Sequence, residues 1–347
     1  MKNRLQNLGI VIDRKKKISF FFDKKKLFGY EGDTLASALL ANDIKLVARS
    51  FKYHRPRGFF SCGVEEPNAL VSIGFGKNFE PNVKATTVKI YEGMISNSQN
   101  CWPNLRLDFG SILSKLSFLF PAGFYYKTFM FPSFAWKSLY EPVIRQISGL
   151  GNAPKENDNE KYEFFYFNAE LLIIGAGISG LKAAEKASKL GLKVLIMEQS
   201  GFLGGRTLVD ENEIEGKNTH DILKQSFKKL KKNKNIILKF NTTVTGIYDH
   251  GFVLANEKII QKGKAKKDLN CRLWKIRAKK IILATGAQER PIVFENNDLP
   301  GIMLLSSIRD YLKLFGVCCG KRIIFFTNND DAYKTALEMF NYNVKIE

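Results

Sequence analysis

The chain has 347 residues, enough for two or three domains, and its 45% apolar and 25% charged residues suit an ordinary globular protein. The net charge of +20 would suit nucleic-acid or membrane binding, but the lysines are scattered and no recognition motif accompanies them. We therefore expect no nucleic acid and no membrane as partner. The charge reflects either a lysine-rich proteome or a basic face that meets an acidic partner subunit.

The cysteines and the apolar segments further limit which classes of protein the sequence is compatible with. None of the five cysteines forms a C-x-x-C pair, so no metal centre is expected, and their odd number suits a reducing cytosol. The N-terminus has no apolar core long enough for a signal peptide, so we expect a cytoplasmic chain. Residues 112–134 are apolar, but lysines and prolines interrupt them, which predicts packing on another domain or subunit rather than a membrane span.

The first 100 residues carry the pattern strand, strand, helix. Residues 17–22 and 26–30 are predicted strands around a lysine-rich turn, and a helix is predicted from Asp33 or Thr34 through Leu40. This order begins a ferredoxin-like β-grasp, which we assign to residues 1–100. Plant-type ferredoxins place a cluster of cysteines after that helix, whereas only Cys62 is nearby here, so the fold is expected without an iron–sulfur cluster.

Two loops after that helix are dense in charge. Residues 55–58 (RPRG) and 63–68 (GVEEPN) suit either a ligand or interface loop, whose arginines clamp an anion or carboxylates, or a solvated loop with an internal Arg–Glu pair. His54 is expected to be structural or exposed. Residues 101–165 are interpreted as a connector, with a polar stretch over residues 149–162.

A glycine-rich turn lies between a predicted strand at residues 170–174 and a predicted helix. Its glycines fit G-x-G-x-x-G: the first allows a tight turn, the second lets a pyrophosphate approach the backbone, and the third lets the helix pack on the strand. The N–H groups at the start of the helix favour the phosphates. The residues of this candidate cofactor site are Gly175, Ala176, Gly177, Ile178, Ser179 and Gly180.

An acidic residue follows at the expected distance. Glu198 closes a second predicted strand, residues 193–197, and lies 18 residues after Gly180, where a carboxylate can accept hydrogen bonds from an adenosine ribose. A 2′-phosphate would clash with it, so NAD or FAD is preferred to NADP, and Gln199 is included in the site. Residues 204–206 (GGR) and 281–287 (IILATGA) are typical of two-dinucleotide flavoproteins, so the dinucleotide-binding domain is assigned to residues 166–305.

The remaining elements complete that domain and begin another. A helix at 222–230, a strand at 235–240, a hairpin of 244–248 with 252–256, and a strand at 273–276 form an inserted meander, with His250 exposed in the hairpin turn. Residues 306–347 begin a second Rossmann-like unit, whose turn at 327–331 lacks glycines and which is interpreted as truncated. No acid–base or nucleophilic constellation is present, so no residue is assigned as catalytic.

Five blocks together carry a family resemblance: residues 29–42, 55–58, 63–71, 121–130 and 286–291. With the glycine-rich site, they make the chain resemble the N-terminal portion of the alpha subunit of heterotetrameric sarcosine oxidases. The resemblance implies oxidation of sarcosine to glycine with O2, giving H2O2 and, with tetrahydrofolate, 5,10-methylenetetrahydrofolate. It implies NAD in this chain (FAD as the alternative), FAD on a beta subunit, FMN at the alpha–beta interface, and gamma and delta subunits.

The same resemblance implies that Gly175, Gly177, Gly180 and Glu198 hold the dinucleotide. It further implies that the site is lined by Gly205, Arg206, Thr285 and Gly286. The family's alpha subunits are far longer, and nothing in this chain resembles their folate domain. Alternatives left open are a subunit of another amine, opine or hydroxyproline dehydrogenase, an independent FAD-dependent NAD(P)H reductase, and a non-catalytic scaffold.

Overall fold

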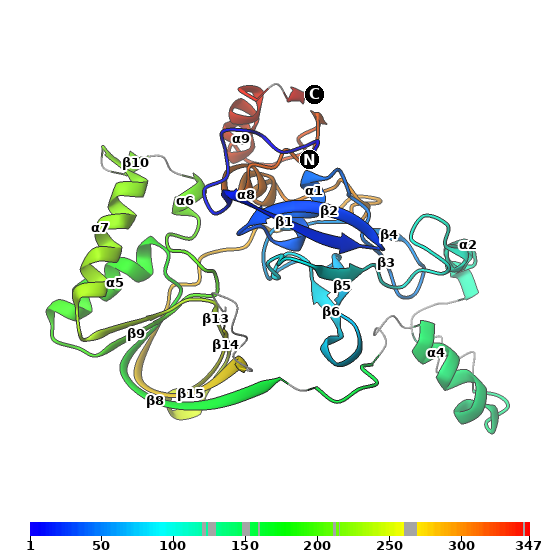
Figure 1. Cartoon of the computed structure of the whole chain (residues 1–347), viewed down its shortest axis with the longest axis horizontal. Helices are drawn as coiled ribbons and strands as arrows, with labels where there is room; N and C mark the ends of the chain where they lie inside the picture. Colours follow the sequence, from blue (N-terminus) through cyan, green and yellow to red (C-terminus); the bar gives the residue numbers. More distant parts are fainter. Residues whose placement is uncertain are drawn as a thin grey trace. The chain divides into compact units, whose positions relative to one another are not determined.

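The computed structural model describes residues 1–119, 123, 130–147, 153–158, 160–210, 213–214, 216–259, 269–342 and 344–347. The chain forms two compact units (Figure 1). The first comprises Met1–Asn157 and Glu289–Glu347, and the second, Asp158–Gln288, is inserted between these segments. No helix among the described residues has the length and apolar character needed to cross a bilayer.

The N-terminal segment of the first unit is built on a five-stranded mixed sheet. Its helices and strands are β1 (Asp13–Phe22), β2 (Lys25–Glu31), α1 (Leu35–Ala41), β3 (Ala48–Arg49), β4 (Pro56–Arg57), β5 (Leu70–Ile73), η1 (Gly76–Asn78), β6 (Glu80–Lys84), β7 (Met94–Asn97), η2 (Phe109–Ser111), α2 (Ile112–Lys115), η3 (Ser117–Leu119), η4 (Trp136–Tyr140) and α4 (Glu141–Ile147). The sheet order is β2-β1-β7-β5-β6, with β1 and β7 parallel and the other neighbours antiparallel.

Helix α1 provides much of this segment's core. Thr34 caps it by accepting the N–H of Ser37, and all seven of its residues are buried. The predicted lysine-rich turn joins β1 to β2 with positive φ at Asp23 and Lys24, as a tight hairpin requires. The structure therefore has the ferredoxin-like β-grasp that the sequence predicts.

The C-terminal segment of the first unit adds a small helical layer. It consists of α8 (Leu305–Phe315), β16 (Arg322–Ile323), α9 (Asp331–Phe340) and β17 (Lys345–Ile346). Strands β16 and β17 are parallel with α9 between them, and Ile308, Leu312 and Met339 form the core there. Residues 306–347 thus contain a strand–helix–strand unit.

The second unit is built on a six-stranded sheet of the order β12-β9-β8-β15-β14-β13. Its helices and strands are β8 (Lys161–Ile174), α5 (Ile178–Lys189), β9 (Val194–Met197), α6 (Thr207–Asp210), β10 (Glu213–Ile214), β11 (Lys217–Asn218), α7 (Thr219–Lys232), β12 (Ile236–Lys239), β13 (Thr242–Tyr248), η5 (Asp249–Gly251), β14 (Phe252–Lys258) and β15 (Leu269–Leu283). The first four strands of the sheet are parallel, and β14 and β13 add an antiparallel hairpin.

Both faces of β9 and of the last residues of β8 are buried. Leu171 and Ile173 of β8 face α5 and α7, whereas Leu172 and Ile174 face the core shared with β14 and β15, where Trp274 packs. A strand covered on both faces reads as a continuous apolar run, which is why residues 170–174 were recognisable in the sequence.

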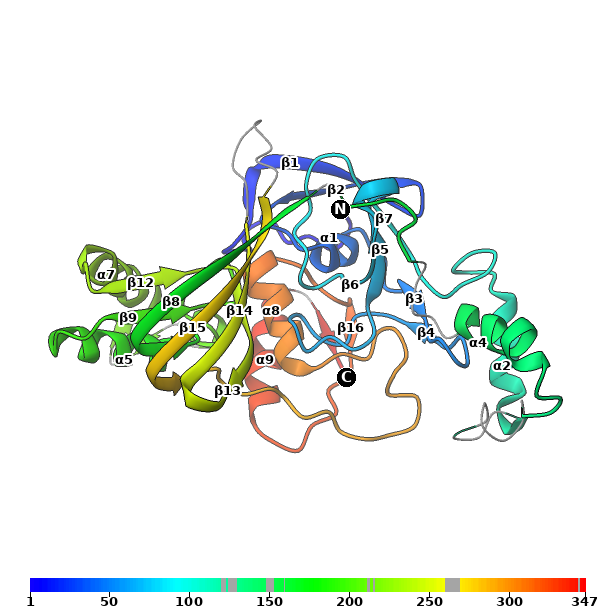
Figure 2. The same cartoon turned by 90° about the horizontal axis from the view of Figure 1, so that it is seen from below.

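Strand β15 differs from the prediction, which placed a strand at residues 273–276 apart from the apolar segment at residues 281–287. It is one strand of 15 residues and pairs with β8 along its length, as Figure 2 shows. Arg277, Lys279 and Lys280 break the apolar pattern without ending the strand, because pairing with β8 continues past them. The hairpin turn is as predicted, with His250 exposed.

Candidate functional site

The predicted cofactor residues come together at one edge of the second unit's sheet. Gly175 follows β8, Glu198 follows β9 and Thr285 lies just beyond β15, and these three strands are parallel. The N–H of Gly175 donates to the carbonyl of Met197 (2.8 Å), and the N–H of Ala284 donates to that of Ile174 (2.8 Å). The carboxyl edge of a parallel sheet is where such folds bind ligands.

Two glycines of the motif are required by the chain's own packing. A Cβ on Gly180 would lie 2.1 Å from the carbonyl oxygen of Gly175. Gly175 has φ of +101°, and a Cβ there would lie 2.3 Å from the carbonyl oxygen of Ala284. These glycines let α5, β8 and the end of β15 approach one another closely.

Gly177 is a glycine for a different reason. Its φ of −69° is available to any residue, and the nearest atom to a built Cβ is the Gly204 carbonyl oxygen at 4.0 Å. Neither backbone conformation nor internal packing therefore demands a glycine at the N-cap of α5. A ligand that came close to the backbone there would require a glycine, and the N-terminus of α5 would favour an anionic group.

Glu198 ties the glycine-rich turn to the end of β9. It is buried, and its Oε2 accepts the N–H of Ala176 (2.8 Å) while Oε1 accepts the N–H of Ser200 (2.8 Å). Each carboxylate oxygen can accept a further hydrogen bond, so the ribose interaction predicted from the sequence remains chemically available. The two internal hydrogen bonds also fix the carboxylate in position, which the sequence did not indicate.

Two of the residues predicted to line the site, Gly205 and Thr285, lie beside this turn. Gly204 bridges to Gly177, and its N–H donates to the Ala176 carbonyl (3.0 Å). Arg206 Nε donates to Asp210 (3.0 Å), so part of its guanidinium is held by the chain itself. The exposed members of the predicted set are Ser179, Gln199, Gly205, Thr285 and Gly286, while Ile178 is half-buried. The N–H groups at the start of α5 and the open space over Gly177 are compatible with a dinucleotide pyrophosphate. The Glu198 carboxylate is compatible with its ribose.

The charged loops of the first unit do not form the internal Arg–Glu pair that was one interpretation of them. Arg55 binds Asp298 with two hydrogen bonds of 2.7 Å, and Arg57 also binds that carboxylate. The arginines therefore clamp a carboxylate, but one from their own chain, 243 residues further on. This fixes the segment that follows the second unit onto residues 55–58, where Gly58 leaves room for Pro300.

We expect Asp298→Asn to lower the unfolding free energy by about 1–2 kcal/mol, because it removes a carboxylate shared by two half-buried arginines. The Arg55 and Arg57 hydrogen bonds hold the pKa of Asp298 well below its ordinary value of 3.8. The stabilisation is therefore complete above that pH and is lost as the pH falls below it. Urea unfolding from pH 3 to 7 checks this, with the exposed Asp330→Asn as the control. If the difference in unfolding free energy between wild type and Asp298→Asn is as large at pH 3 as at pH 7, the ionised Asp298 carboxylate is not what stabilises the fold.

Glu66 organises the second charged loop. It is buried, and its two oxygens accept the N–H groups of four residues, Phe60, Ser61, Asn68 and Ala69, at 2.6–3.1 Å. Burial raises its pKa above the ordinary value, and the four N–H donors offset part of that rise. Glu66 is thus a structural residue that holds residues 60–69 in one conformation.

The block at residues 286–291 also has a structural role. Glu289 accepts the N–H groups of Leu305 (3.1 Å) and Ser306 (2.7 Å), so it caps the N-terminus of α8 from outside the helix. Of the block at residues 121–130, only Gly123 and Met130 are among the described residues.

The ferredoxin-like domain does not supply the ligands of an iron–sulfur cluster. A [2Fe–2S] cluster is held by four cysteines, or by two cysteines and two histidines, and residues 15–101 contain only Cys62, Cys101 and His54 of these types. Among the described residues, no group of three or more His, Cys, Asp or Glu side chains is placed to hold a metal ion.

Comparisons with known proteins agree with both halves of the fold. The family described as "2Fe-2S iron-sulfur cluster binding domain" matches residues 15–101, and "Pyridine nucleotide-disulphide oxidoreductase" matches residues 169–316. L-proline dehydrogenase from P. horikoshii is similar in structure, with a TM-score of 0.64 over 99% of this chain and 55% of that chain, at 21% identity. The predicted fold class, a ferredoxin-like domain followed by an FAD/NAD-binding domain, is confirmed.

Closer relatives are found by sequence. Sarcosine oxidase subunit alpha from Rhizobium meliloti (strain 1021) is 45% identical over 97% of this chain and 34% of its own length. The same subunit from Corynebacterium sp. (strain U-96) is 33% identical over 96% of this chain and 30% of its own length. The chain thus spans about a third of the length of the curated relatives it matches. The predicted resemblance is confirmed: over nearly its whole length, this chain is a relative of sarcosine oxidase alpha subunits.

Proposed function

We propose that this chain is the dinucleotide-binding part of an alpha subunit in a sarcosine-oxidase-type oxidoreductase. The observation that carries the proposal is Gly177, which neither its φ nor its packing requires, at a helix N-terminus next to a fixed carboxylate. The 45% identity to a sarcosine oxidase subunit alpha connects that site to amine oxidation.

NAD is the proposed ligand, with FAD as the alternative. Gly175 and Gly180 shape the turn, Gly177 admits the pyrophosphate, and Glu198 accepts the ribose hydroxyls. A 2′-phosphate would lie against the Glu198 carboxylate, which disfavours NADP. When bound, the dinucleotide supplies a site for hydride transfer, and the chain's residues orient it and keep its phosphates at the helix terminus.

The proposed reaction is oxidative demethylation of sarcosine to glycine. Two electrons leave the N-methyl group and reduce O2 to H2O2, and the one-carbon unit passes to tetrahydrofolate as 5,10-methylenetetrahydrofolate. We assign amine oxidation to a flavin-bearing beta subunit, with FAD and FMN in the complex, and include gamma and delta subunits in a cytoplasmic heterotetramer. This chain contributes cofactor binding and assembly.

The test is co-expression with a flavin-bearing beta subunit, followed by release of bound nucleotides and their identification by absorbance and mass. We expect NAD from this chain, flavin from the partner, and peroxide production that depends on sarcosine. Turnover of proline or opines in place of sarcosine would assign the complex to another amine dehydrogenase. FAD on this chain alone, reduced by NADH without a partner, would instead identify an independent reductase. A chain without nucleotide would contradict the proposal and favour a scaffold.

A further inference from the structure

A pocket of about 500 Å³ lies within the first unit, and none of the residues that line it belongs to the second unit. Three segments that are distant in the sequence form it: the N-terminus, the turn after α1, and the residues just before β16. Its lining residues are Lys2, Asn3, Asp43, Lys45, Gly320 and Lys321. Three of these six residues are lysines and one is acidic, so the pocket carries an excess of positive charge.

Hydrogen bonds of Asn3 join the three segments. Its N–H donates to the carbonyl of Ala41 at the end of α1 (3.1 Å), and its side-chain amide donates to Asp43 Oδ1 (3.2 Å). The Asn3 carbonyl accepts the N–H of Cys318 (2.9 Å), and the Cys318 thiol donates to the carbonyl of Gly320 (2.9 Å). The walls of the pocket are therefore fixed to one another, which reduces the conformational entropy lost when a ligand binds.

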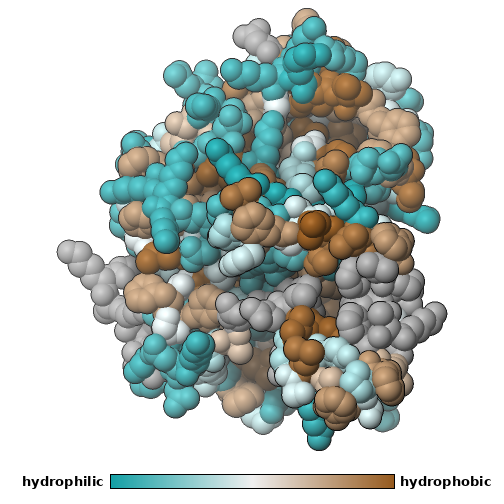
Figure 3. All heavy atoms as spheres, turned by 90° about the vertical axis from the view of Figure 1, so that its right-hand side faces the viewer, coloured by the Kyte–Doolittle hydropathy of each residue, from teal (hydrophilic) through white to brown (hydrophobic). Residues whose placement is uncertain are grey.

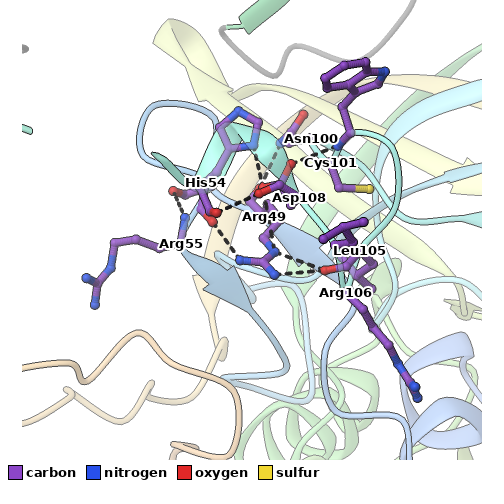
Figure 4. A network of polar contacts seen from close by, with 12 residues as sticks. Arg49, His54, Arg55, Asn100, Cys101, Leu105, Arg106 and Asp108 are labelled. Carbon is purple, nitrogen blue, oxygen red and sulfur yellow. Dashed lines mark hydrogen bonds and ion pairs between the residues drawn. The ribbon is translucent and has the colours of Figure 1, made fainter. Parts of the chain in front are cut away.

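Elsewhere in the first unit, cationic side chains are neutralised by the chain itself. Figure 4 shows one example: Arg49 lies 4.0 Å from the buried carboxylate of Asp108, which also contacts His54 Nδ1 (2.8 Å). This contact is the structural role expected of His54. The arginines of residues 55–58 likewise share the carboxylate of Asp298.

The lysines of the pocket differ in this respect. Among the described residues, none of Lys2, Lys45 and Lys321 is paired with a carboxylate, and Asp43 in the same pocket accepts the Asn3 amide instead. Exposed hydrophilic side chains are frequent on this chain, as Figure 3 shows for one face, so exposure alone does not indicate a site. These three lysines stand out because they line one concave surface, where the fields of like charges add and attract an anion.

The charge of Lys45 also acts on two buried thiols next to the pocket. Burial raises the pKa of the Cys318 and Cys319 thiols, and the positive charge of Lys45 lowers it in part. Lys45 therefore lies close to the segment that carries Gly320 and Lys321. Two segments of the chain thus bring positive charge to the same place.

The number of lysines indicates the kind of anion. Lysine ammonium groups bind phosphates as point charges, and three of them match a ligand whose negative charge is concentrated on neighbouring phosphates. The volume of the pocket suits a small molecule. The Asp43 carboxylate can accept further hydrogen bonds, so it can bind a hydroxyl or amino group of such a ligand.

We propose that this pocket binds a compact molecule that carries a pyrophosphate group, either inorganic pyrophosphate or a nucleoside diphosphate. Lys2, Lys45 and Lys321 surround the phosphates. The proposed function does not use this pocket, because the candidate dinucleotide site lies in the second unit.

Isothermal titration of the full chain with inorganic pyrophosphate, ADP and inorganic phosphate tests the proposal. We expect the double variant Lys45→Ala, Lys321→Ala to bind pyrophosphate at least about tenfold more weakly than wild type, because two charge pairs are lost. Gly177→Ala, which alters the glycine-rich turn, should bind pyrophosphate as wild type does. Lys334→Ala is the matched control, since Lys334 is an exposed lysine on α9 outside the pocket. Urea unfolding verifies the fold of each variant.

The titrations also identify the ligand. Tighter binding of ADP than of inorganic pyrophosphate to the pocket would identify a nucleoside diphosphate, and the reverse would identify inorganic pyrophosphate. Either result supports the proposal if the double variant loses that binding.

Four outcomes would overturn the proposal. In the first, wild type binds neither pyrophosphate nor ADP at about 1 mM. In the second, pyrophosphate binds no more tightly than inorganic phosphate, so the pocket attracts an adventitious ion only. In the third, Lys334→Ala weakens binding as much as the double variant does. In the fourth, Gly177→Ala loses the binding and the double variant keeps it, which would assign the pyrophosphate to the glycine-rich turn.

Discussion

Gly180→Val is expected to remove nearly all bound dinucleotide and to lower the unfolding free energy by about 3 kcal/mol. A valine Cβ would lie 2.1 Å from the Gly175 carbonyl oxygen, so α5 must move away from β8. That movement displaces the helix N-terminus from the phosphate position. Nucleotide content per chain and urea unfolding measure the two effects, and Lys182→Ala, an exposed change on the same helix, is the control.

Gly177→Ala separates ligand binding from packing. The chain has room for this methyl group, so we expect the unfolding free energy to change by less than about 1 kcal/mol. The methyl group would occupy the space into which the pyrophosphate must come, so bound nucleotide should fall at least tenfold. If Gly177→Ala retains full nucleotide content, the ligand does not approach the backbone there. If Gly180→Val keeps the wild-type unfolding free energy and the wild-type amount of bound nucleotide, α5 and β8 do not require a glycine at this position.

Glu66→Gln is expected to lower the unfolding free energy by about 3–4 kcal/mol. One of the two carboxylate oxygens becomes an NH2 group, which would face two backbone N–H donors that then have no acceptor. Thermal and urea unfolding measure the loss. The neighbouring Glu65→Gln, which alters one hydrogen bond to the N–H of Gly63, should cost less than about 1 kcal/mol. If Glu66→Gln and Glu65→Gln lower the unfolding free energy equally, the hydrogen bonds of Glu66 do not stabilise the fold more than that of Glu65.

The arrangement of the candidate dinucleotide site was largely predictable because the segments that form it are close in the sequence. An apolar run, glycines at fixed spacing and an acid 18 residues later lie within 30 residues, and the structure brings them to one edge of a parallel sheet. The spacing of the motif does not show why each glycine is needed. The structure shows that packing requires Gly180 but does not require Gly177.

The partners of the charged loops could not be predicted. Arg55 and Arg57 bind Asp298, which is distant in the sequence, and Glu66 binds backbone N–H groups, which are present in every sequence. Glu289 likewise caps a helix that begins 16 residues later. The continuity of β15 depends on its pairing with β8, so a prediction based on local hydrophobicity missed it at the charged residues Arg277, Lys279 and Lys280.

The insertion of one unit within the other sets an order of events during synthesis. Contacts that close the first unit join its two segments: the Tyr311 hydroxyl donates to the Ser61 carbonyl, and the N–H of Leu304 donates to that of Phe60. A ribosome releases the whole of Asp158–Gln288 before it releases either partner residue. The whole of Asp158–Gln288 is therefore synthesised while Phe60 and Ser61 still lack their hydrogen-bonding partners. During that interval the surface that α8 later covers has no covering helix.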